Sequence, residues 1–395
     1  MSLQQTVAPV EFYMPPVTVI GSGAIKEIPA KLASLGGTKP LLVTDKGMTQ
    51  LGVTASIVQI IQAAGMQCAV YDETVPNPTD QNVNDGLAQY ANNGCDCIIT
   101  LGGGSAHDCG KGVGIVATNG GTIHQYEGVN KARVAMPPFI AVNTTAGTAS
   151  EMTRFCIITD TTRKVKMAIV DWRVTPSIAL DDPELMVGMP PSLTAATGID
   201  ALTHAVEAYV STEATHLTDA NAEKAIKLIA KYLRRAVGNG RNIEAREAMC
   251  FAQYQAGMAF NNAGLGYVHA MAHQLGGLLN LPHGECNAIL LPHVCEFNML
   301  SAMDRFAEMA GFFGVQATAR TQREAATNMI QAIRDLLQDI GIPSSLTLLA
   351  KKYGKTVNPE DFSAMADSAM KDACAATNPR NMTKQDIMAI YRKIL

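Results

Sequence analysis

The chain has 395 residues, of which 47% are hydrophobic and 17% charged, and its net charge is −4 at pH 7. A single core usually stops growing at roughly 250–300 residues, so we expect two globular domains. The scattered Lys and Arg residues disfavour a nucleic-acid partner, and the N-terminus shows neither a signal peptide nor a membrane-spanning run. We therefore expect a cytoplasmic protein with no membrane partner.

The first half alternates short apolar runs with helical segments, an arrangement typical of a parallel sheet covered on both faces. The runs span residues 40–45, 68–73, 95–104, 139–147 and 176–183. We predict an α/β dinucleotide-binding domain with a parallel sheet over residues 1–185.

Beyond residue 185 the apolar residues recur with the helical period of 3.6. Residues 218–237 and 321–340 are Ala-rich amphipathic segments. Asn358, which precedes a proline, and Thr383 are suited to be the N-caps of two further helices. We predict an all-α domain over residues 186–395.

Two glycine-rich segments compete as a nucleotide-binding loop. Residues 21–26, GSGAIK, begin like a GxGxxG fingerprint but have Lys26 in place of the third glycine. Residues 101–111, LGGGSAHDCGK, follow an apolar strand and lead into a helical segment, where glycines let the backbone approach a pyrophosphate. The second segment is the better candidate, although a tight turn alone would also require such glycines.

Asp45 ends the apolar run 40–45, as would a carboxylate that accepts hydrogen bonds from an adenosine ribose. Such a carboxylate repels a 2′-phosphate and so favours NAD over NADP, while an ordinary helix N-cap is the alternative. Residues 143–150, NTTAGTAS, form another polar loop after a strand. Its Thr144, Thr145 and Thr148 can reach a phosphate or a ribose.

Histidines gather in the helical half. Asp200 and His204 are four residues apart, as are His269 and His273, so each pair projects from one helix face. His283 follows in a loop-like context between a proline and a glycine. Carboxylate and imidazole groups on facing helices can hold Fe, Zn, Mn or Co. The spacing leaves open whether the third ligand is His269 or His273, and a lone histidine among apolar residues is often only a core residue.

No Lys or Arg occurs in residues 184–210 or 261–295, the segments around these histidines. We therefore expect the metal surroundings to offer no cation to a phosphate or carboxylate. A small neutral substrate fits such a site better than a charged one.

Together these motifs make the chain resemble the iron-containing, or group III, alcohol dehydrogenase family over essentially its whole length. The motifs are GGGSAHD (102–108), TTAGTAS (144–150), GIDALTHAVEAY (198–209), HAMAHQLGG (269–277) and PHGECNAILLPH (282–293). Residues 143–155, 164–171 and 378–380 make it most similar to the branch containing methanol, 1,3-propanediol and ethanol dehydrogenases. The resemblance implies the family's architecture, shared with dehydroquinate synthase-like proteins.

The resemblance also implies a metal site and an NAD site. The implied ligands of Fe²⁺, with Zn²⁺ or Mn²⁺ as alternatives, are Asp200, His204, His269 and His283. His273 then lies beside substrate and nicotinamide as a candidate catalytic residue. The implied cofactor-binding residues are Asp45, Asn77, Gly103, Gly104, Ser105, Asp108, Thr144, Thr145, Thr148 and Lys166.

The chain departs from the family pattern at two positions. Ala106 stands where many members have proline, which loosens the turn but removes no hydrogen-bond donor. Glu285 stands where a small apolar residue is common. That carboxylate either alters the electrostatics of the metal site or faces solvent.

The implied activity interconverts small neutral primary alcohols or diols and their aldehydes by hydride transfer with NAD, in a homo-oligomer. His273 would relay the proton. One alternative is a lyase or synthase on the same scaffold that acts on a phosphorylated substrate, which the lack of cations near the histidines disfavours. The other is a non-catalytic metal-binding protein, which the intact cofactor loops disfavour.

Overall fold

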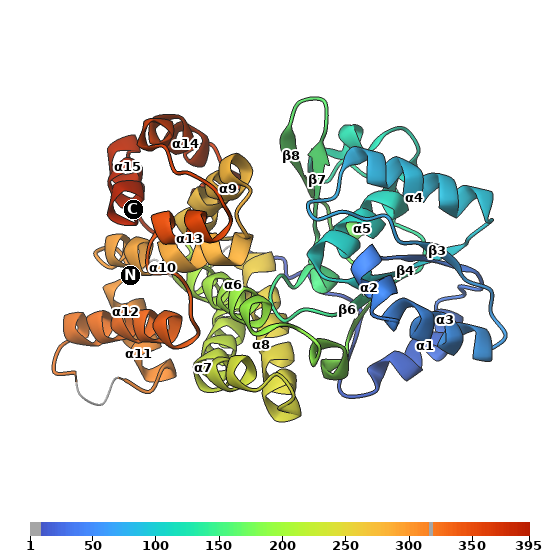
Figure 1. The fold of residues 1–395 in the computed structure, drawn as a ribbon, viewed down its shortest axis with the longest axis horizontal. Helices are drawn as coiled ribbons and strands as arrows, with labels where there is room; N and C mark the ends of the chain where they lie inside the picture. Colours follow the sequence, from blue (N-terminus) through green and yellow to red (C-terminus); the bar gives the residue numbers. More distant parts are fainter. Residues whose placement is uncertain (1–8, 316–318) are drawn as a thin grey trace, which may run out of the picture.

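A computed structural model describes residues 9–315 and 319–395. The chain forms an α/β half, on the right of Figure 1, and a helical half on the left. The change falls between the last strand, β9 (Ile178–Asp181), and the helix α6 (Pro191–Val210). The predicted fold class is confirmed, while the domain limit at residues 185/186 stays a prediction.

A six-stranded parallel sheet forms the centre of the α/β half, in the order β1-β9-β6-β4-β2-β3. Besides β9, its strands are β1 (Val17–Ile20), β2 (Pro40–Val43), β3 (Ala69–Tyr71), β4 (Cys97–Gly102) and β6 (Phe139–Asn143). Gly102 at the end of β4 pairs with Asn143 at the end of β6. The loops that follow these strands therefore meet at one edge of the sheet, where parallel sheets bind ligands.

Helices cover both faces of this sheet. They are α1 (Ile28–Ser34), α2 (Lys46–Gln50), α3 (Val53–Ala63), α4 (Asp80–Asn92) and α5 (Gly104–Asn119). Because side chains alternate along a strand, Leu42 packs with α1 and α3, whereas Leu41 packs with α4 and α5. The sheet is buried on both sides, which explains the continuous apolar runs in the sequence.

A small second sheet, which the sequence analysis did not predict, lies between the halves. It contains β5 (Gly128–Val129), β7 (Phe155–Asp160) and β8 (Val165–Val170) in the order β5-β8-β7. The strands β7 and β8 form an antiparallel hairpin, which stands at the top of Figure 1 on the side facing the helices. This hairpin carries Lys166.

The helical half is built around α6, which is buried along most of its length because small and apolar residues occupy nearly all its faces. The other helices are α7 (His216–Gly238), α8 (Ile243–Ala263), α9 (Tyr267–Leu279), α10 (His283–Asn298), α11 (Met303–Phe312), α12 (Gln322–Asp339), α13 (Leu346–Lys352), α14 (Phe362–Ala369) and α15 (Lys384–Lys393). None of the described helices is long and apolar enough to cross a bilayer.

The helix signals of the sequence are largely confirmed. The segments 218–237 and 321–340 form α7 and α12, and Thr383 caps α15 through a reciprocal capping box. Asn358 takes the N-cap position of the 3-10 helix η7 (Pro359–Asp361), which runs directly into α14, although its side chain makes no capping hydrogen bond. One expectation was wrong. His283 lies in no loop but begins α10, because the extended backbone of the preceding proline takes the N-cap position.

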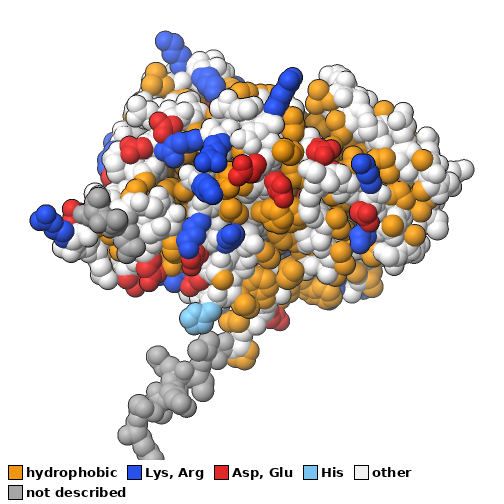
Figure 2. All heavy atoms as spheres, turned by 90° about the horizontal axis from the view of Figure 1, so that it is seen from below, with side chains coloured by type: hydrophobic (Ala, Val, Ile, Leu, Met, Phe, Trp, Pro, Cys, Tyr) orange, Lys and Arg blue, Asp and Glu red, His pale blue; other side chains and the backbone are white. Residues whose placement is uncertain are grey.

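Charges of both signs share the surface. On the face shown in Figure 2, acidic side chains lie among the basic ones, and apolar side chains gather around the middle. Near the N-terminus, Val10, Met14 and Val17 are among the exposed apolar residues. Val17 belongs to β1, an edge strand of the large sheet whose partner among the described strands is β9.

Candidate metal and cofactor site

Three of the predicted metal ligands converge from three helices. Asp200 lies on α6, His269 on α9 and His283 on α10, and one donor atom from each lies within 4.8 Å of the others. The Nε2 atoms of His269 and His283 are 3.7 and 3.5 Å from Oδ1 of Asp200. One carboxylate oxygen and two imidazole nitrogens suit a divalent transition-metal ion.

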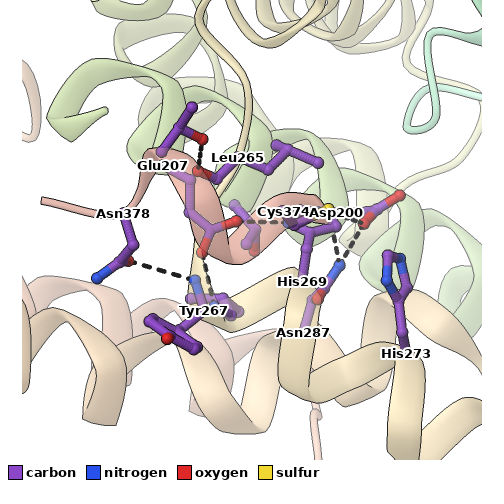
Figure 3. Close-up of polar contacts among 12 residues, drawn as sticks. Asp200, Glu207, Leu265, Tyr267, His269, His273, Asn287, Cys374 and Asn378 are labelled. Carbon is purple, nitrogen blue, oxygen red and sulfur yellow. Dashed lines mark hydrogen bonds and ion pairs between the residues drawn. The ribbon is translucent and has the colours of Figure 1, made fainter. Parts of the chain in front are cut away.

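A buried carboxylate on α6, Glu207, decides which nitrogen of His269 faces this centre (Figure 3). Its Oε2 lies 2.6 Å from Nδ1 of His269, and its Oε1 accepts the Val268 N–H at 2.7 Å. Because an ionised carboxylate only accepts hydrogen bonds, Nδ1 of His269 donates and Nε2 is directed toward Asp200. Metal-binding histidines commonly have such a carboxylate behind them. The geometry therefore favours His269 over His273 as a ligand, a choice that spacing left open.

The charges around this centre favour a cation. Burial lowers the pKa of His269, but hydrogen bonds to Asp200 and Glu207 outweigh it and raise that pKa to about 9. Burial likewise opposes ionisation of Asp200, yet the surrounding imidazoles, those of His204 and His283 first, hold its pKa well below the usual range. A divalent ion bound here would displace the proton of His269.

An amide side chain joins the three donor atoms. Asn287 lies one turn after His283 on α10, and its Nδ2 is 2.7 Å from Oδ1 of Asp200. The same atom is 3.1 Å from Nε2 of His269 and 3.1 Å from Nε2 of His283. The three donor atoms thus point to a common region, as a metal site requires.

The fourth predicted ligand, His204, lies beside this group without joining it. Its ring stacks between Phe260 and His269, with centroid distances of 4.2 and 4.6 Å. Burial lowers its pKa to about 4, so the ring is neutral and able to bind a metal. Its buried Nδ1 has no hydrogen-bond partner within residues 9–315 and 319–395. An orphaned buried group typically costs ~1–3 kcal/mol, which coordination of a metal through Nδ1 would recover.

The glycine-rich loop after β4 packs against the loop after β6. A Cβ at Gly103 would lie 3.1 Å from the Thr145 side chain, and one at Gly104 would lie 3.2 Å from Thr148. Gly103 occupies the N-cap of α5 without a side-chain cap, so backbone N–H groups at the helix start are available to an anion. These loops fit the pyrophosphate of a dinucleotide. The competing segment 21–26 overlaps η1 (Ala24–Glu27), a 3-10 helix that runs directly into α1, so its glycines do not begin an α-helix.

Other predicted cofactor residues surround the same edge. Asp45 caps α2 by accepting the Met48 N–H at 3.0 Å, while its Oδ2 lies 3.6 Å from the position a Cβ of Gly102 would take. The Thr144 N–H donates to the Gly102 carbonyl oxygen. Asp45 is therefore the N-cap of α2, and its contact with an adenosine ribose stays a prediction.

Asn77, Ser105 and Lys166 come together from three segments. The Asn77 N–H donates to Oγ of Ser105 at 3.3 Å, and Nζ of Lys166 donates to Oδ1 of Asn77 at 2.7 Å. Asn77 adopts a left-handed backbone with φ of 56°. This contact joins the β7–β8 hairpin to the start of α5.

Asp108 and a buried lysine anchor α5 to residues 150–155. Oγ of Ser150 donates to Asp108 at 2.8 Å, and burial raises the pKa of this carboxyl to about 6. Lys111 is fully buried, and its Nζ donates to the carbonyl oxygens of Ser150, Thr153 and Phe155 at 2.6, 2.9 and 2.7 Å. Lys111 was not among the predicted site residues. A contact between Asp108 and the cofactor stays a prediction.

Two family profiles match nearly the whole chain. "Iron-containing alcohol dehydrogenase" matches residues 15–183, and "Fe-containing alcohol dehydrogenase family, C-terminal" matches residues 194–395. The chain belongs to the iron-containing alcohol dehydrogenase family. The predicted family and the oxidoreductase class are confirmed.

Relatives within the iron-containing alcohol dehydrogenase family cover the same length. A 1,3-propanediol dehydrogenase of Klebsiella pneumoniae is 50% identical over 97% of this chain and 98% of the relative. An NAD-dependent methanol dehydrogenase of Bacillus methanolicus is 44% identical over 97% and 99%. A crystal structure of a 1,3-propanediol oxidoreductase, 50% identical, superimposes with a TM-score of 0.95 and covers 98% of this chain and 100% of that one.

One expectation about this alcohol dehydrogenase was wrong: the charge of a lysine outside the two segments, Lys166, acts on the predicted ligand His283. Nζ of Lys352, on α13, is 2.6 Å from Oε1 of Glu285, and the charge of Lys166 adds to the burial that lowers the pKa of His283. Both lysines come from outside the two segments that lack Lys and Arg. Glu285 is buried and paired, so it does not face solvent.

Two supporting residues of this centre were missed. Glu207 follows Asp200 by seven residues and His204 by three, so all three share one helix face. Asn287 follows His283 by four. The helical period, extended beyond histidine and aspartate to other polar residues, would have identified both.

Proposed function

We propose that the chain is an NAD(H)-dependent alcohol dehydrogenase that interconverts small neutral primary alcohols or diols and their aldehydes. The convergence of Asp200, His269 and His283 in front of Glu207 carries this proposal. The names of the relatives, which include a 1,3-propanediol and an NAD-dependent methanol dehydrogenase, support the substrate class.

In this proposal His204 completes the ligand set with Asp200, His269 and His283, and the ion is Fe²⁺, with Zn²⁺ or Mn²⁺ as alternatives. When bound, the ion supplies Lewis-acid chemistry and the nicotinamide exchanges hydride. Glu207 keeps Nε2 of His269 directed at the centre. His273, whose ring stacks on that of His283 at a centroid distance of 5.3 Å, accepts the proton of the alcohol and returns it during aldehyde reduction.

The loops after β2, β4 and β6 hold NAD. The glycines at 103 and 104 leave room for the pyrophosphate, and Thr144, Thr145 and Thr148 bind it or the ribose from the opposite side. Ser105, at the start of α5, and its neighbours Asn77 and Lys166 lie beside the same loop. Asp45 accepts the ribose hydroxyls and repels a 2′-phosphate, so NAD is favoured over NADP.

The test combines analysis of the bound metal with rates of NAD-linked alcohol oxidation. Purified protein is loaded separately with Fe²⁺, Zn²⁺ or Mn²⁺ and assayed with NAD on methanol, ethanol, 1,3-propanediol and 1,2-propanediol. We expect oxidation of at least one alcohol, and loss of activity after chelation. His269→Gln should lose the metal, whereas the control His216→Gln, at an exposed position that begins α7, should retain it. Failure of all four alcohols with all three metals contradicts the proposal.

We further propose that the protein is a cytoplasmic homo-oligomer. Free thiols persist in a reducing compartment, and all nine cysteines are free. One side of β1 pairs with no strand in residues 9–315 and 319–395, and with its exposed Val17 it offers an edge on which a second copy can pair. Light scattering after size exclusion measures the assembly, and a monomer at micromolar concentration contradicts it. A fluorescent fusion locates the protein in cells.

A further inference from the structure

His273 has a carboxylate neighbour that lies outside every motif of the sequence. His273 is on α9, one turn beyond His269, and its Nδ1 lies 2.8 Å from Oδ2 of Asp372. Asp372 comes from a distant part of the chain, the connection between α14 and the 3-10 helix η8 (Ala373–Thr377). In Figure 3 the His273 ring stands next to Asn287, near Asp200.

Asp372 is itself held in place. Its Oδ1 accepts the Cys374 N–H at 2.9 Å and so caps η8. Burial acts to raise the pKa of Asp372, but the hydrogen bonds from His273 and Cys374 outweigh it and lower that pKa below its usual value. The side chain is therefore an ionised acceptor with both oxygens engaged. An ionised acceptor next to a ring nitrogen requires the proton to be on that nitrogen.

The other ring nitrogen of His273 is left available. Nε2 makes no hydrogen bond to any residue in the described part of the chain, and the side chain is 32% exposed. In a neutral imidazole, one nitrogen donates and the other accepts. With the proton on Nδ1, Nε2 is the atom that can accept a proton from an alcohol.

We propose that Asp372 is a positioning residue that fixes the orientation and the tautomer of His273, so that its Nε2 faces the substrate. This inference rests on the proton-transfer role given to His273 under the proposed function. A carboxylate that orients a catalytic imidazole in this way is a recurring solution in unrelated enzymes. Asp372 itself touches neither substrate nor cofactor.

The test is a double-mutant cycle in the metal-loaded enzyme, with the alcohol that the unmodified chain oxidises fastest. Asp372→Asn keeps the size of the side chain and its oxygen can still cap η8, but its amide can donate to Nδ1 and so stabilise the wrong tautomer. We expect kcat to fall about 10–100-fold, less than the roughly 10²–10⁴-fold that a general acid–base group itself contributes, because His273 remains present. Metal content, the Kd for NADH and the melting temperature should not change.

The decisive comparison is the same substitution in a His273→Gln background. There Asp372→Asn should change kcat less than twofold, because the residue acts only through His273. Asp367→Asn is the matched control, since Asp367 lies on the adjacent α14 and pairs with Lys384 at the surface. It should leave kcat unchanged.

Each other outcome overturns a different statement. An equal loss in both backgrounds means that Asp372 acts through η8 and refutes the inference. Full activity of Asp372→Asn together with a slow His273→Gln variant refutes the inference but leaves the role of His273 standing. Full activity of His273→Gln refutes both, and activity on no alcohol refutes the proposed function itself.

Discussion

Replacing Glu207 by Gln tests how the metal centre is held together. The two oxygens of Glu207 accept two N–H groups, those of Val268 and of Nδ1 of His269. A carboxamide has only one acceptor oxygen, so one of these donors must face the new NH₂ group. The His269 bond is charge-assisted, and such bonds contribute about 1.5–3 kcal/mol. Loss of a carboxylate behind a metal-binding histidine typically lowers the affinity for the metal 10–100-fold, or ~1.4–2.7 kcal/mol. This loss agrees with the free energy of the charge-assisted hydrogen bond.

We therefore expect Glu207→Gln to raise the dissociation constant of the metal 10–100-fold, measured by competition with a chelator and by elemental analysis. Glu308→Gln is the matched control: Glu308, on α11, accepts the Tyr209 hydroxyl at 2.7 Å, an interaction that a carboxamide oxygen can keep. If Glu207→Gln binds the metal within threefold of the unmodified chain, Glu207 does not orient His269 and the reasoning fails.

Three further predictions concern the rest of the chain. Gly103→Ala places a methyl group 3.1 Å from a threonine of the facing loop and should weaken NADH binding about tenfold (~1.4 kcal/mol) in a fluorescence titration; an unchanged Kd would argue against a cofactor loop here. Burial raises the pKa of Glu151 above the unfolded value of about 4.3, so its stabilising contribution is fully present below that value and is lost as pH rises through the folded pKa. Glu151→Gln should therefore gain melting temperature relative to the unmodified chain between pH 5 and pH 8, and a pH-independent difference contradicts this. Lys352→Met leaves the buried Glu285 carboxylate without its cation and should cost about 1–2 kcal/mol in chemical denaturation, less than the ~3–5 for a fully buried pair because Lys352 is 40% exposed; a second change, Glu285→Ala, should recover most of the loss.

Local patterns predicted the architecture well because each signal depends on neighbouring residues. The apolar runs became the strands of a sheet buried on both faces, and Thr383 formed the capping box that its sequence suggested. The β7–β8 hairpin escaped prediction because the expectation relied on continuously buried runs. In β7, buried residues alternate with half-buried ones, and β8 includes exposed residues such as Lys166.

The site was harder to predict where contacts are distant in sequence. Asp200 and His204 were recognisable from their helical spacing, but the partner of His273 is 99 residues away. Lys352 reaches Glu285 across 67 residues, so a survey of the segments around the histidines could not find it. The spacing left His269 and His273 as alternatives, and the family resemblance favoured His269; the contact with Glu207, which supports this choice, is visible only in the structure.

The enclosed Lys111 offers a chemical reporter of motion between two segments of the α/β half, α5 and residues 150–155. Amine-reactive reagents need an accessible, uncharged Nζ, and this atom is surrounded by the carbonyl oxygens of Ser150, Thr153 and Phe155. Lys111 can react only while residues 150–155 separate from α5. The rate at which mass spectrometry detects its labelling therefore measures how often this contact opens, and a bound ligand that holds the two segments together would slow the labelling without any change in the surface lysines.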